Sequence, residues 1–411
     1  MRILLFSYIS FDSSEYAGGN WIKSLLSSLS KDNSVGVVYL SHESSSKWFM
    51  DNVCFYPILR RESILVKFFG RYFIRREDVI ARKQVDAIIE NFKPDIIQLF
   101  GLETFWGSIV SHVKKIPVAV HIQGIAKACH DAWFPNGYTR SSILKYSSLK
   151  EILLRQTPFD NYCRFGKKVE AEAENYLLYR YFMGRTEWDK EWCKRLNPDS
   201  VYFHCDELIR EDFYTRRWKY SSGKVLISSI ANGEIYKGFD TILKTAHVLK
   251  LSNLDFEWNV YGVNEDFSAR KIFEKTERIL FSDCNVFFRG KKVASELADA
   301  LEQSTFYIHC SHVDNSPNSL CEAMLVGVPC ISSNVGGIPS LITDGKDGVL
   351  CPDNDVNAFA HAIMALHNDE AKMMSLSEAA HNTASLRHDS SSVISSLYKI
   401  YSSIIELADY K

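Results

Sequence analysis

Residues 306–345, FYIHCSHVDNSPNSLCEAMLVGVPCISSNVGGIPSLITDG, carry the clearest structural pattern in this chain of 411 residues. Apolar strands are predicted over Phe306–Cys310 and Pro329–Ser332, with a short helix between them that ends at Gly327. The Gly336-Gly337 pair predicts a turn that starts another helix. This alternation is typical of a βαβα unit in a parallel sheet, which binds ligands at the carboxyl ends of its strands.

Two acidic residues lie in this unit. Asp314 follows the first strand, and Glu322 comes eight positions later, inside the predicted helix. Ser316-Pro317 predicts the start of that helix, with the hydroxyl as cap and proline at the first helical position, and Ser319 is an alternative cap. Backbone N–H groups at such a helix start suit a phosphate or sugar oxygen.

With these residues, the region resembles the retaining glycosyltransferases of glycosyltransferase family 4. Their signature is an acid, seven residues, Glu-Ala-Met and a Gly-x-Pro turn. This chain has Asp314, seven residues, Glu322-Ala323-Met324 and Gly327-Val328-Pro329. The first acid is usually Glu in the family, so Asp314 keeps the charge on a shorter side chain. The resemblance covers nearly the whole chain and is closest from Lys224 onward.

The resemblance implies the α/β fold called GT-B, in which two Rossmann-like, doubly wound parallel-sheet domains face a central cleft. Residues 1–215 then form the acceptor-side domain and residues 216–390 the domain that binds the nucleotide sugar. A C-terminal helix over residues 391–411 is expected to cross back to the first domain. The chain length agrees, because 411 residues are too many for one hydrophobic core.

Composition excludes several classes of protein. With 46% hydrophobic and 24% charged residues the chain is globular, and a net charge of −2 does not indicate nucleic-acid binding. The ten cysteines are scattered without a Cys-x-x-Cys pair, which favours reduced thiols in the cytoplasm. No apolar run approaches the length of a membrane-spanning helix.

A basic stretch lies at Arg60–Lys83, where eight basic and three acidic residues are interleaved with aromatic residues. Such a stretch predicts peripheral contact with an anionic membrane surface, here the inner face of the cytoplasmic membrane. The alternative is a packed helix with a solvated basic face.

Two candidate sites lie in the first domain. Gly18-Gly19 follow the predicted first strand, Arg2–Ser7, and His121 lies at the carboxyl end of the strand Val118–Ile122. Taken alone, the glycines indicate a plain loop and His121 a structural histidine. In the resembling family, both positions approach the donor, and residues 126–181 face the acceptor.

Lys237 is the basic candidate of the second domain. It precedes Gly238 at a strand-to-helix turn, where a cation stabilises a bound phosphate, although a plain surface lysine is the alternative. The family pattern here has an Arg as well, but this chain has Glu234 in its place. The second phosphate cation is therefore either missing or supplied from elsewhere, with Arg289 and Lys291 as the candidates.

Further candidates for donor binding lie at the ends of strands in the second domain. Gly262 and Arg289-Gly290 end two further strands of the second domain, and the loop after the second of these strands borders the nucleotide base in the family. Asp353-Asn354-Asp355 predicts a helix cap rather than a metal site, so no metal or cofactor is expected.

The predicted site residues form two groups. The predicted catalytic residues are His121, Lys237 and Asp314, and the donor-binding residues are Gly18, Gly19, Gly262, Arg289, Gly290, Asn315, Ser316, Asn318, Ser319 and Glu322.

The resemblance implies a retaining transfer of sugar from a nucleotide-diphosphate sugar to a hydroxyl of a glycan or lipid-linked saccharide, with bacterial surface polysaccharide biosynthesis as the setting by analogy. One alternative is a nucleotide-sugar epimerase on the same fold. Another is a non-catalytic sugar-binding homologue, which Ser340 in place of a usual Glu leaves open.

Overall fold

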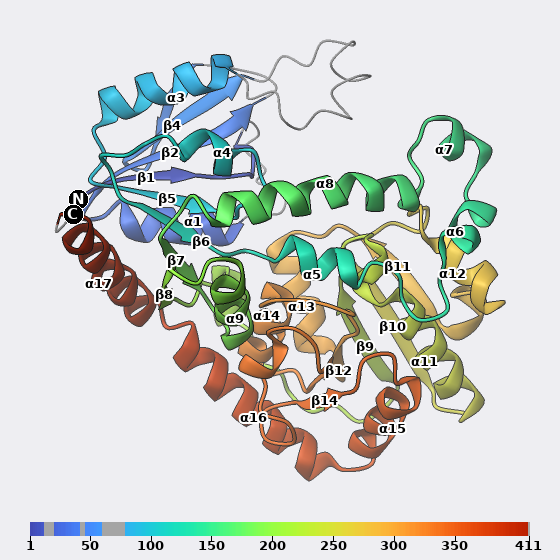
Figure 1. Cartoon of the computed structure of the whole chain (residues 1–411). Helices are drawn as coiled ribbons and strands as arrows, with labels where there is room; N and C mark the ends of the chain where they lie inside the picture. The colour runs from blue at the N-terminus through green and yellow to red at the C-terminus, as the bar shows by residue number, and fades with distance from the viewer. Residues whose placement is uncertain (12–19, 42–45, 60–78, 410–411) are drawn as a thin grey trace. The chain divides into compact units, whose positions relative to one another are not determined.

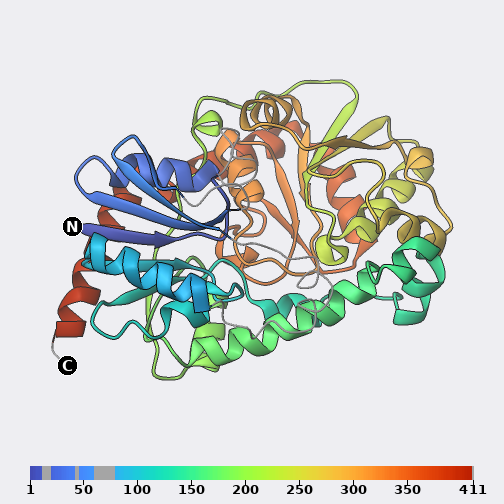
Figure 2. The same ribbon diagram turned by 90° about the horizontal axis from the view of Figure 1, so that it is seen from above.

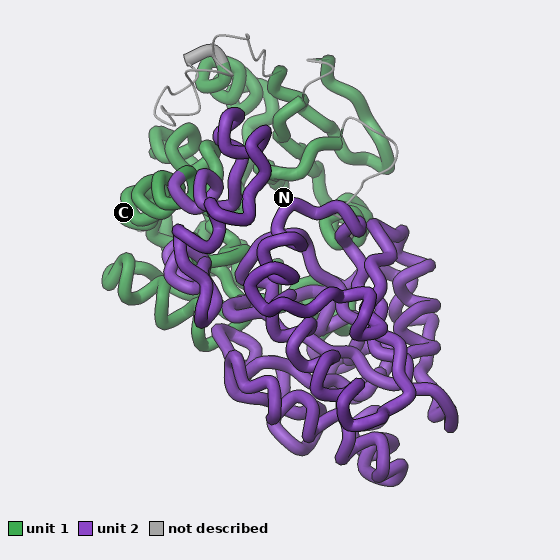
Figure 3. Tube along the Cα trace, turned by 90° about the vertical axis from the view of Figure 1, so that its right-hand side faces the viewer, with its two compact units in different colours: residues 1–126, 164–208, 388–411 green, residues 127–163, 209–387 purple. Residues whose placement is uncertain are grey.

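The computed structural model describes residues 1–11, 20–41, 46–59 and 79–409. Its helices and strands are labelled in Figure 1. The chain forms two compact units, coloured separately in Figure 3. The first contains residues 1–126, 164–208 and 388–411, and the second contains residues 127–163 and 209–387. This division differs from the one expected from the sequence, which was a single boundary after residue 215 with residues 127–163 in the first domain.

The first unit contains an eight-stranded sheet in the order β3-β4-β2-β1-β5-β6-β7-β8. All neighbouring strands are parallel except β3, which is antiparallel to β4. Strands β1 and β5 are almost continuous apolar runs because a parallel sheet is covered on both faces. Figure 2 shows the blue strands of this sheet side by side. The strands are β1 (Arg2–Phe6), β2 (Ser34–Ser41), β3 (Trp48–Met50), β4 (Val53–Leu59), β5 (Ile96–Phe100), β6 (Val118–His121), β7 (Tyr181–Gly184) and β8 (Val201–His204).

The C-terminal helix α17 (Ser390–Asp409) belongs to this first unit. Its buried residues Leu397, Tyr401 and Ile404 share one hydrophobic core with Ile3 and Val35 of the sheet. This packing confirms that the C-terminal helix returns to the first domain. The other helices that lie wholly or mainly in the unit are α1 (Asn20–Leu29), α3 (Val79–Phe92), α4 (Trp106–Val110), α8 (Pro158–Tyr176) and α9 (Glu187–Leu196).

The second unit contains a parallel six-stranded sheet in the order β11-β10-β9-β12-β13-β14. The chain order reverses between β9 and β12, so the loops after these two strands meet at the topological switch point of a doubly wound sheet. Ligands bind at such points in open α/β sheets. The strands are β9 (Val225–Ile230), β10 (Phe256–Tyr261), β11 (Val286–Gly290), β12 (Phe306–His309), β13 (Cys330–Ser333) and β14 (Val349–Cys351).

Helices cover this second sheet, and several of them share its core. Phe239 on the first helix after β9 and Trp258 on β10 are both fully buried there. The helices are α5 (Ala126–Asp131), α6 (Arg140–Tyr146), α7 (Leu149–Leu153), α10 (Glu211–Tyr214), α11 (Phe239–Leu251), α12 (Arg270–Glu277), α13 (Ala294–Gln303), α14 (Asn318–Val326), α15 (Val356–His367) and α16 (Glu370–Arg387). Among the described residues, none of the helices has both the length and the apolar character needed to cross a bilayer.

One local expectation differs from the structure, and another is confirmed. The helix predicted after Gly336-Gly337 is only a 3-10 turn, η4 (Ile338–Ser340), in which Pro339 lacks a backbone N–H. The cap predicted at Asp355 is present, since its carboxylate accepts from the Ala358 N–H at the start of α15. Strands β3, β4 and β14 were not predicted from the sequence, because they are short or carry no clear turn signal.

Candidate functional site

The turn after β9 lies against the loop after β12. It runs through the 3-10 turn η2 (Ile235–Lys237) into Gly238, which has a φ of 78°. A Cβ atom at Gly238 would lie 1.9 Å from the carbonyl oxygen of Cys310, so only glycine permits this approach. The close packing places Lys237 beside Asp314, with 2.7 Å between Nζ and Oδ2.

Asp314 has a second polar partner. His309 Nε2 lies 3.1 Å from the same oxygen, Oδ2, and the Tyr307 hydroxyl lies 3.4 Å from His309 Nδ1. Burial alone would raise the pKa of Asp314, but the Lys237 ammonium and His309 lower it well below its usual value. Asp314 is therefore an ionised carboxylate held beside a lysine at the switch point.

The Gly336-Gly337 turn fixes the backbone of Asp314. The Gly337 N–H donates to the carbonyl oxygen of Asp314 at 3.0 Å. Gly336 has a φ of 55°, and a Cβ there would lie 1.9 Å from the same oxygen. The turn that was expected to start a helix thus packs against the loop that carries the acid.

Helix α14 begins beside this loop, at Asn318. The predicted serine caps are wrong, because Pro317 occupies the cap position and no side-chain cap hydrogen bond forms. Asn315 and Ser316 are buried before the helix, and the Ser319 side chain hydrogen-bonds to Tyr307 instead. The partial positive charge of the helix start still lies near the loop of Asp314.

Glu322 is buried inside α14, with 4% of its side chain exposed. Arg210 binds it with both arms of its guanidinium group, with distances of 2.7 Å from Nε to Oε1 and from Nη2 to Oε2. Burial raises the pKa of Glu322, and Arg210 opposes that shift. No local pattern indicates this pair, since Arg210 lies 112 positions before Glu322 in the chain.

The glycines at the ends of β10 and β11 join two loops. Gly262 donates its N–H to the carbonyl oxygen of Gly290 at 2.9 Å, and both residues have positive φ. Arg289 has carboxylate and amide partners on β10, with 2.8 Å from Nη2 to Glu257 Oε1 and 2.5 Å from Nε to Asn259 Oδ1. The guanidinium proposed as the second phosphate cation is therefore already ion-paired, whereas Lys291 is exposed.

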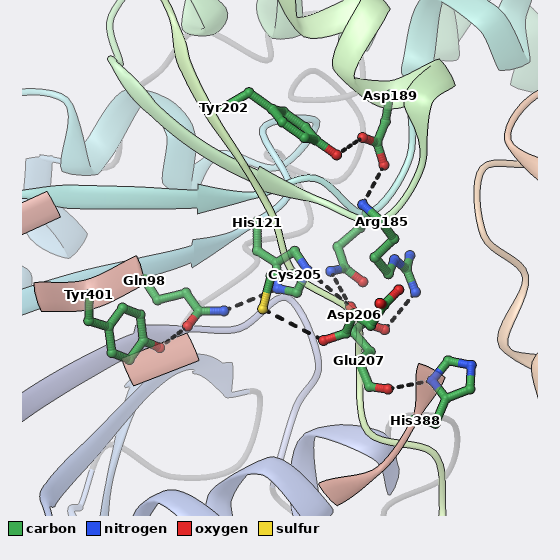
Figure 4. Close-up of polar contacts among 11 residues, drawn as sticks. Gln98, His121, Arg185, Asp189, Tyr202, Cys205, Asp206, Glu207, His388 and Tyr401 are labelled. Carbon is green, nitrogen blue, oxygen red and sulfur yellow. Dashed lines mark hydrogen bonds and ion pairs between the residues drawn. The ribbon is translucent and has the colours of Figure 1, made fainter. Parts of the chain in front are cut away.

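His121 of the first unit lies in a buried polar cluster (Figure 4). Tyr401 on α17 donates its hydroxyl hydrogen to Gln98 Oε1, so the Gln98 amide nitrogen points at His121 Nδ1, 3.2 Å away. An amide nitrogen only donates, so Nδ1 accepts and the ring proton lies on Nε2. Burial lowers the pKa of His121 to about 4, and the ring is neutral near pH 7.

His121 Nε2 faces a carboxylate but is not hydrogen-bonded to it. Glu207 Oε1 lies 3.7 Å away, and Glu207 is held by Arg185 and by Gln123, at 2.7 Å and 2.8 Å. Across the described part of the chain, Nε2 has no hydrogen-bond partner. A buried N–H donor without a partner costs free energy.

Glu103 is a residue that the sequence reasoning missed. It follows β5 in the loop Gly101–Thr104, and burial raises the pKa of its carboxyl group. Its Oε2 has no hydrogen-bond partner among the described residues. The signal was available, because an acidic residue directly after a buried parallel strand lies at the ligand-binding edge of the sheet.

Some predicted residues fall outside the described ranges. These are Gly18 and Gly19, and residues 60–78 of the basic stretch Arg60–Lys83. In the described residues, no group of three or more His, Cys, Asp and Glu side chains is arranged to hold a metal ion.

Comparisons with known proteins identify the relatives of this chain. The family model described as glycosyl transferases group 1 matches residues 211–383. The chain is 32% identical over 252 residues to the N-acetyl-alpha-D-glucosaminyl L-malate synthase of Bacillus anthracis, which covers 60% of this chain and 63% of that protein. It is 29% identical over 160 residues to the amylovoran biosynthesis glycosyltransferase AmsK of Erwinia amylovora, covering 38% and 39%. The matched regions thus span less than two thirds of these relatives.

Two solved structures are similar over the whole fold. The sucrose-phosphate synthase from Thermosynechococcus elongatus has a TM-score of 0.72 at 14% identity, covering 98% of this chain and 99% of that one. Anabaena Alr3699/HepE in complex with UDP and glucose has a TM-score of 0.66 at 12% identity, with the same coverage. Both likenesses establish the fold, which is GT-B. Residues 211–383 of the chain are therefore similar to the glycosyl transferases group 1 family.

Proposed function

We propose that this protein is a retaining glycosyltransferase of family 4 that transfers a sugar from a nucleotide-diphosphate sugar to a hydroxyl of a glycan or lipid-linked saccharide. The observation that carries the proposal is the Lys237–Asp314 pair at the switch point of the second sheet. A cation and an ionised acid side by side suit a donor that has a diphosphate next to a ring of hydroxyl groups. Relatives named for amylovoran and colanic acid biosynthesis support bacterial surface polysaccharide biosynthesis as the setting.

Lys237 stabilises the leaving diphosphate in this proposal. An ammonium group has three N–H donors, and the bond to Asp314 uses one of them, which leaves two for phosphate oxygens. The bond from the anomeric carbon to the phosphate oxygen breaks, and a bond from the acceptor oxygen to that carbon forms. The acceptor proton passes to the departing diphosphate, whose negative charge Lys237 and the start of α14 stabilise without a metal cofactor.

The other residues orient the donor. Asp314 binds hydroxyls of the sugar, together with backbone amides between Asn315 and Ser319. Glu322 binds the ribose, since a carboxylate has about four lone-pair positions and Arg210 occupies two of them. The loops that end in Gly262 and Gly290 border the base, and Lys291 is the remaining candidate for a second phosphate cation.

The first unit supplies groups for the sugar and the acceptor. His121 donates its Nε2–H to a sugar oxygen, which would satisfy a buried donor that now has no partner in the described residues. Glu103 accepts a hydrogen bond from another hydroxyl of the acceptor, not from the one that reacts. We place the reaction in the cytoplasm, where nucleotide sugars are available.

The experiment measures the thermal shift of the purified protein with UDP, GDP, ADP and CMP and with their sugar conjugates, in the presence of EDTA. Binding to the native state raises the melting temperature by mass action. We expect one nucleotide to give a shift that Lys237→Ala and Glu322→Ala abolish. The matched control is Lys224→Ala, which removes an exposed lysine from the start of the same sheet.

Activity is then tested with the donor so identified, and the anomeric configuration of the product is read by NMR. Retention is expected. An inverted product would contradict the retaining mechanism, whereas epimerised donor without transfer would favour an epimerase. A protein that binds none of these nucleotides would contradict the donor assignment and favour a non-catalytic homologue.

A further inference from the structure

His312 lies between two carboxylates, close to the Lys237–Asp314 pair. It belongs to the loop after β12, and 3% of its side chain is exposed. Nε2 lies 2.8 Å from Asp240 Oδ1, and Nδ1 lies 2.7 Å from Asp353 Oδ1. Ionised carboxylates only accept hydrogen bonds, so both ring nitrogens donate and the ring is an imidazolium. His312 is therefore a buried cation held by two anions.

The bonds of His312 fix both sides of the turn that carries Lys237. On one side, the Asp240 carboxylate belongs to the first turn of α11. On the other side, the His312 backbone N–H donates to the Tyr236 carbonyl oxygen at 2.9 Å. Because His312 lies two positions before Asp314, these bonds connect the turn of the lysine to the loop of the acid.

The charges around His312 balance only while the ring keeps its proton. Among the described residues, the other charged groups of this bridge are Asp240 and Lys244 on α11 and Asp353 after β14, and Lys244 Nζ lies 3.0 Å from Asp240 Oδ2. Two cations thus meet two carboxylates. The nearby Cys310 thiol stays neutral, because burial raises its pKa. A neutral His312 ring could donate to only one carboxylate, so loss of the proton breaks one side of the bridge.

We propose that His312 is a positioning residue for donor binding, which holds Lys237 beside Asp314 and lowers the affinity for the nucleotide when it loses its proton. The ring acts through these two residues and not on the ligand, because it is buried and both of its nitrogens are engaged. This proposal rests on the proposed function for its ligand, whereas the link between His312 and the Lys237–Asp314 pair can be tested without any ligand.

The first test measures the coupling free energy between Lys237 and Asp314 by urea denaturation of the full chain at neutral pH. The cycle combines Lys237→Met with Asp314→Asn, once in the wild type and once in the His312→Gln background. We expect His312→Gln to remove most of the coupling, because the turn is then no longer held against the loop. The milder variant Asp353→Asn, at a side chain that is 35% exposed, provides the background if His312→Gln does not fold.

The matched control is Asp347→Asn, which removes the charge of another buried carboxylate in the same unit. Asp347 accepts hydrogen bonds from the Thr343 N–H at 2.7 Å and from the Thr383 hydroxyl at 2.9 Å. Its substitution therefore lowers the stability without changing the bridge, and the coupling should persist in this background. A coupling that persists equally in His312→Gln overturns the proposal.

The second test follows the affinity for the nucleotide against pH. Burial alone would lower the pKa of His312, but the two carboxylates raise it to about 9. The wild type should therefore bind about tenfold more weakly as the pH rises through that value, the loss expected for one hydrogen bond to a charged group. Asp353→Asn removes one of the carboxylates and should move this loss to lower pH, whereas Asp347→Asn should keep the wild-type profile.

Calorimetry measures these affinities with the nucleotide that stabilises the wild type against heat, and the titration of the nucleotide itself is the same for all variants. Identical pH profiles for Asp353→Asn and the wild type would also overturn the proposal. A wild type that binds none of the tested nucleotides instead contradicts the proposed function, and the coupling between Lys237 and Asp314 then decides the role of His312.

Discussion

Lys237 and Asp314 form an ion pair at 2.7 Å although 77 positions separate them in the chain. The pair exists because β9 and β12 are neighbours in the second sheet and Gly238 allows the turn of Lys237 to approach Cys310. A charged pair with about one sixth of each side chain exposed is a costly arrangement for a purely structural role, since both groups lose hydration. Its place at the switch point makes it the first feature to test.

The acid stability of the protein depends on Asp314. Its pKa in the folded state is lower than in the unfolded chain, so the carboxylate contributes stability above about pH 4 that is lost as the pH falls further. We therefore expect chemical denaturation between pH 5 and 2.5 to show a shallower loss of stability for Asp314→Asn than for the wild type. Asp266→Asn, at an exposed position, should follow the wild-type curve. Parallel curves for all three proteins would contradict the assignment.

We expect the contributions of Arg210 and Glu322 to the free energy of unfolding to depend on each other. Arg210→Ala leaves a buried carboxylate without its partner, and the free energy of unfolding should decrease by about 3 kcal/mol. The double variant Arg210→Met/Glu322→Met should recover most of this loss, because it removes both charges together. Urea denaturation of the full double-mutant cycle measures the coupling.

The control cycle uses Arg216 and Asp299, which also pair at 2.7 Å but are 31% and 50% exposed. It should give a coupling of about 1 kcal/mol or less. If the two substitutions change the free energy of unfolding additively, the Arg210–Glu322 ion pair does not stabilise the protein in solution.

His312 makes the stability of the second unit depend on pH in the alkaline range. It is buried between Asp240 and Asp353, with 2.8 Å from Nε2 to Asp240 Oδ1 and 2.7 Å from Nδ1 to Asp353 Oδ1, and Lys244 also binds Asp240. Burial alone would lower the pKa of His312, but the two carboxylates raise it to about 9.

The stabilisation by His312 is fully present below pH 6.5, the value of an unperturbed histidine, and is lost as the pH rises through about 9. We expect the melting temperature of the wild type to fall between pH 7 and 9.5 relative to that of His312→Gln. His361→Gln, at an exposed position, is the control and should retain the wild-type slope. If His312→Gln retains that slope as well, the imidazolium bridge is absent.

The C-terminal helix sets the tautomer of His121. Tyr401 orients the Gln98 amide, and Tyr401→Phe removes the hydroxyl that does so. We expect 15N NMR of the histidine rings to show His121 as the Nε2–H tautomer in the wild type and as a mixture in the variant. Under the proposed function, kcat/KM should fall about fivefold, the equivalent of one ordinary hydrogen bond.

The matched control is Tyr398→Phe on the same helix, whose hydroxyl accepts a hydrogen bond from Asn33 at 2.7 Å. It should leave the His121 signals unchanged. An unaltered His121 spectrum in Tyr401→Phe would refute the role of Gln98, whereas an altered spectrum with unchanged activity would show that the tautomer does not matter to the reaction.

Much of the fold could be predicted because the signals are local. Strands such as β5 and β12 are short apolar runs, and the cap at Asp355 depends on residues three positions apart. Asp314 and Glu322 were found as candidates because their spacing and the turn at Gly327 belong to one continuous segment. Local reasoning was wrong at Gly336-Gly337, where contact with the Asp314 backbone takes the place of a helix start.

The sequence by itself determined the alternation of buried strands and capped helices, because hydrophobic periodicity and turn chemistry act over a few residues. Only the tertiary structure decided which polar groups meet. Arg210 reaches Glu322 across 112 positions, and Tyr401 reaches Gln98 across 303. The physical reason is that a side chain's charge and hydrogen-bonding capacity are visible in the sequence, whereas its partner depends on sheet order and on the burial that makes a partner necessary.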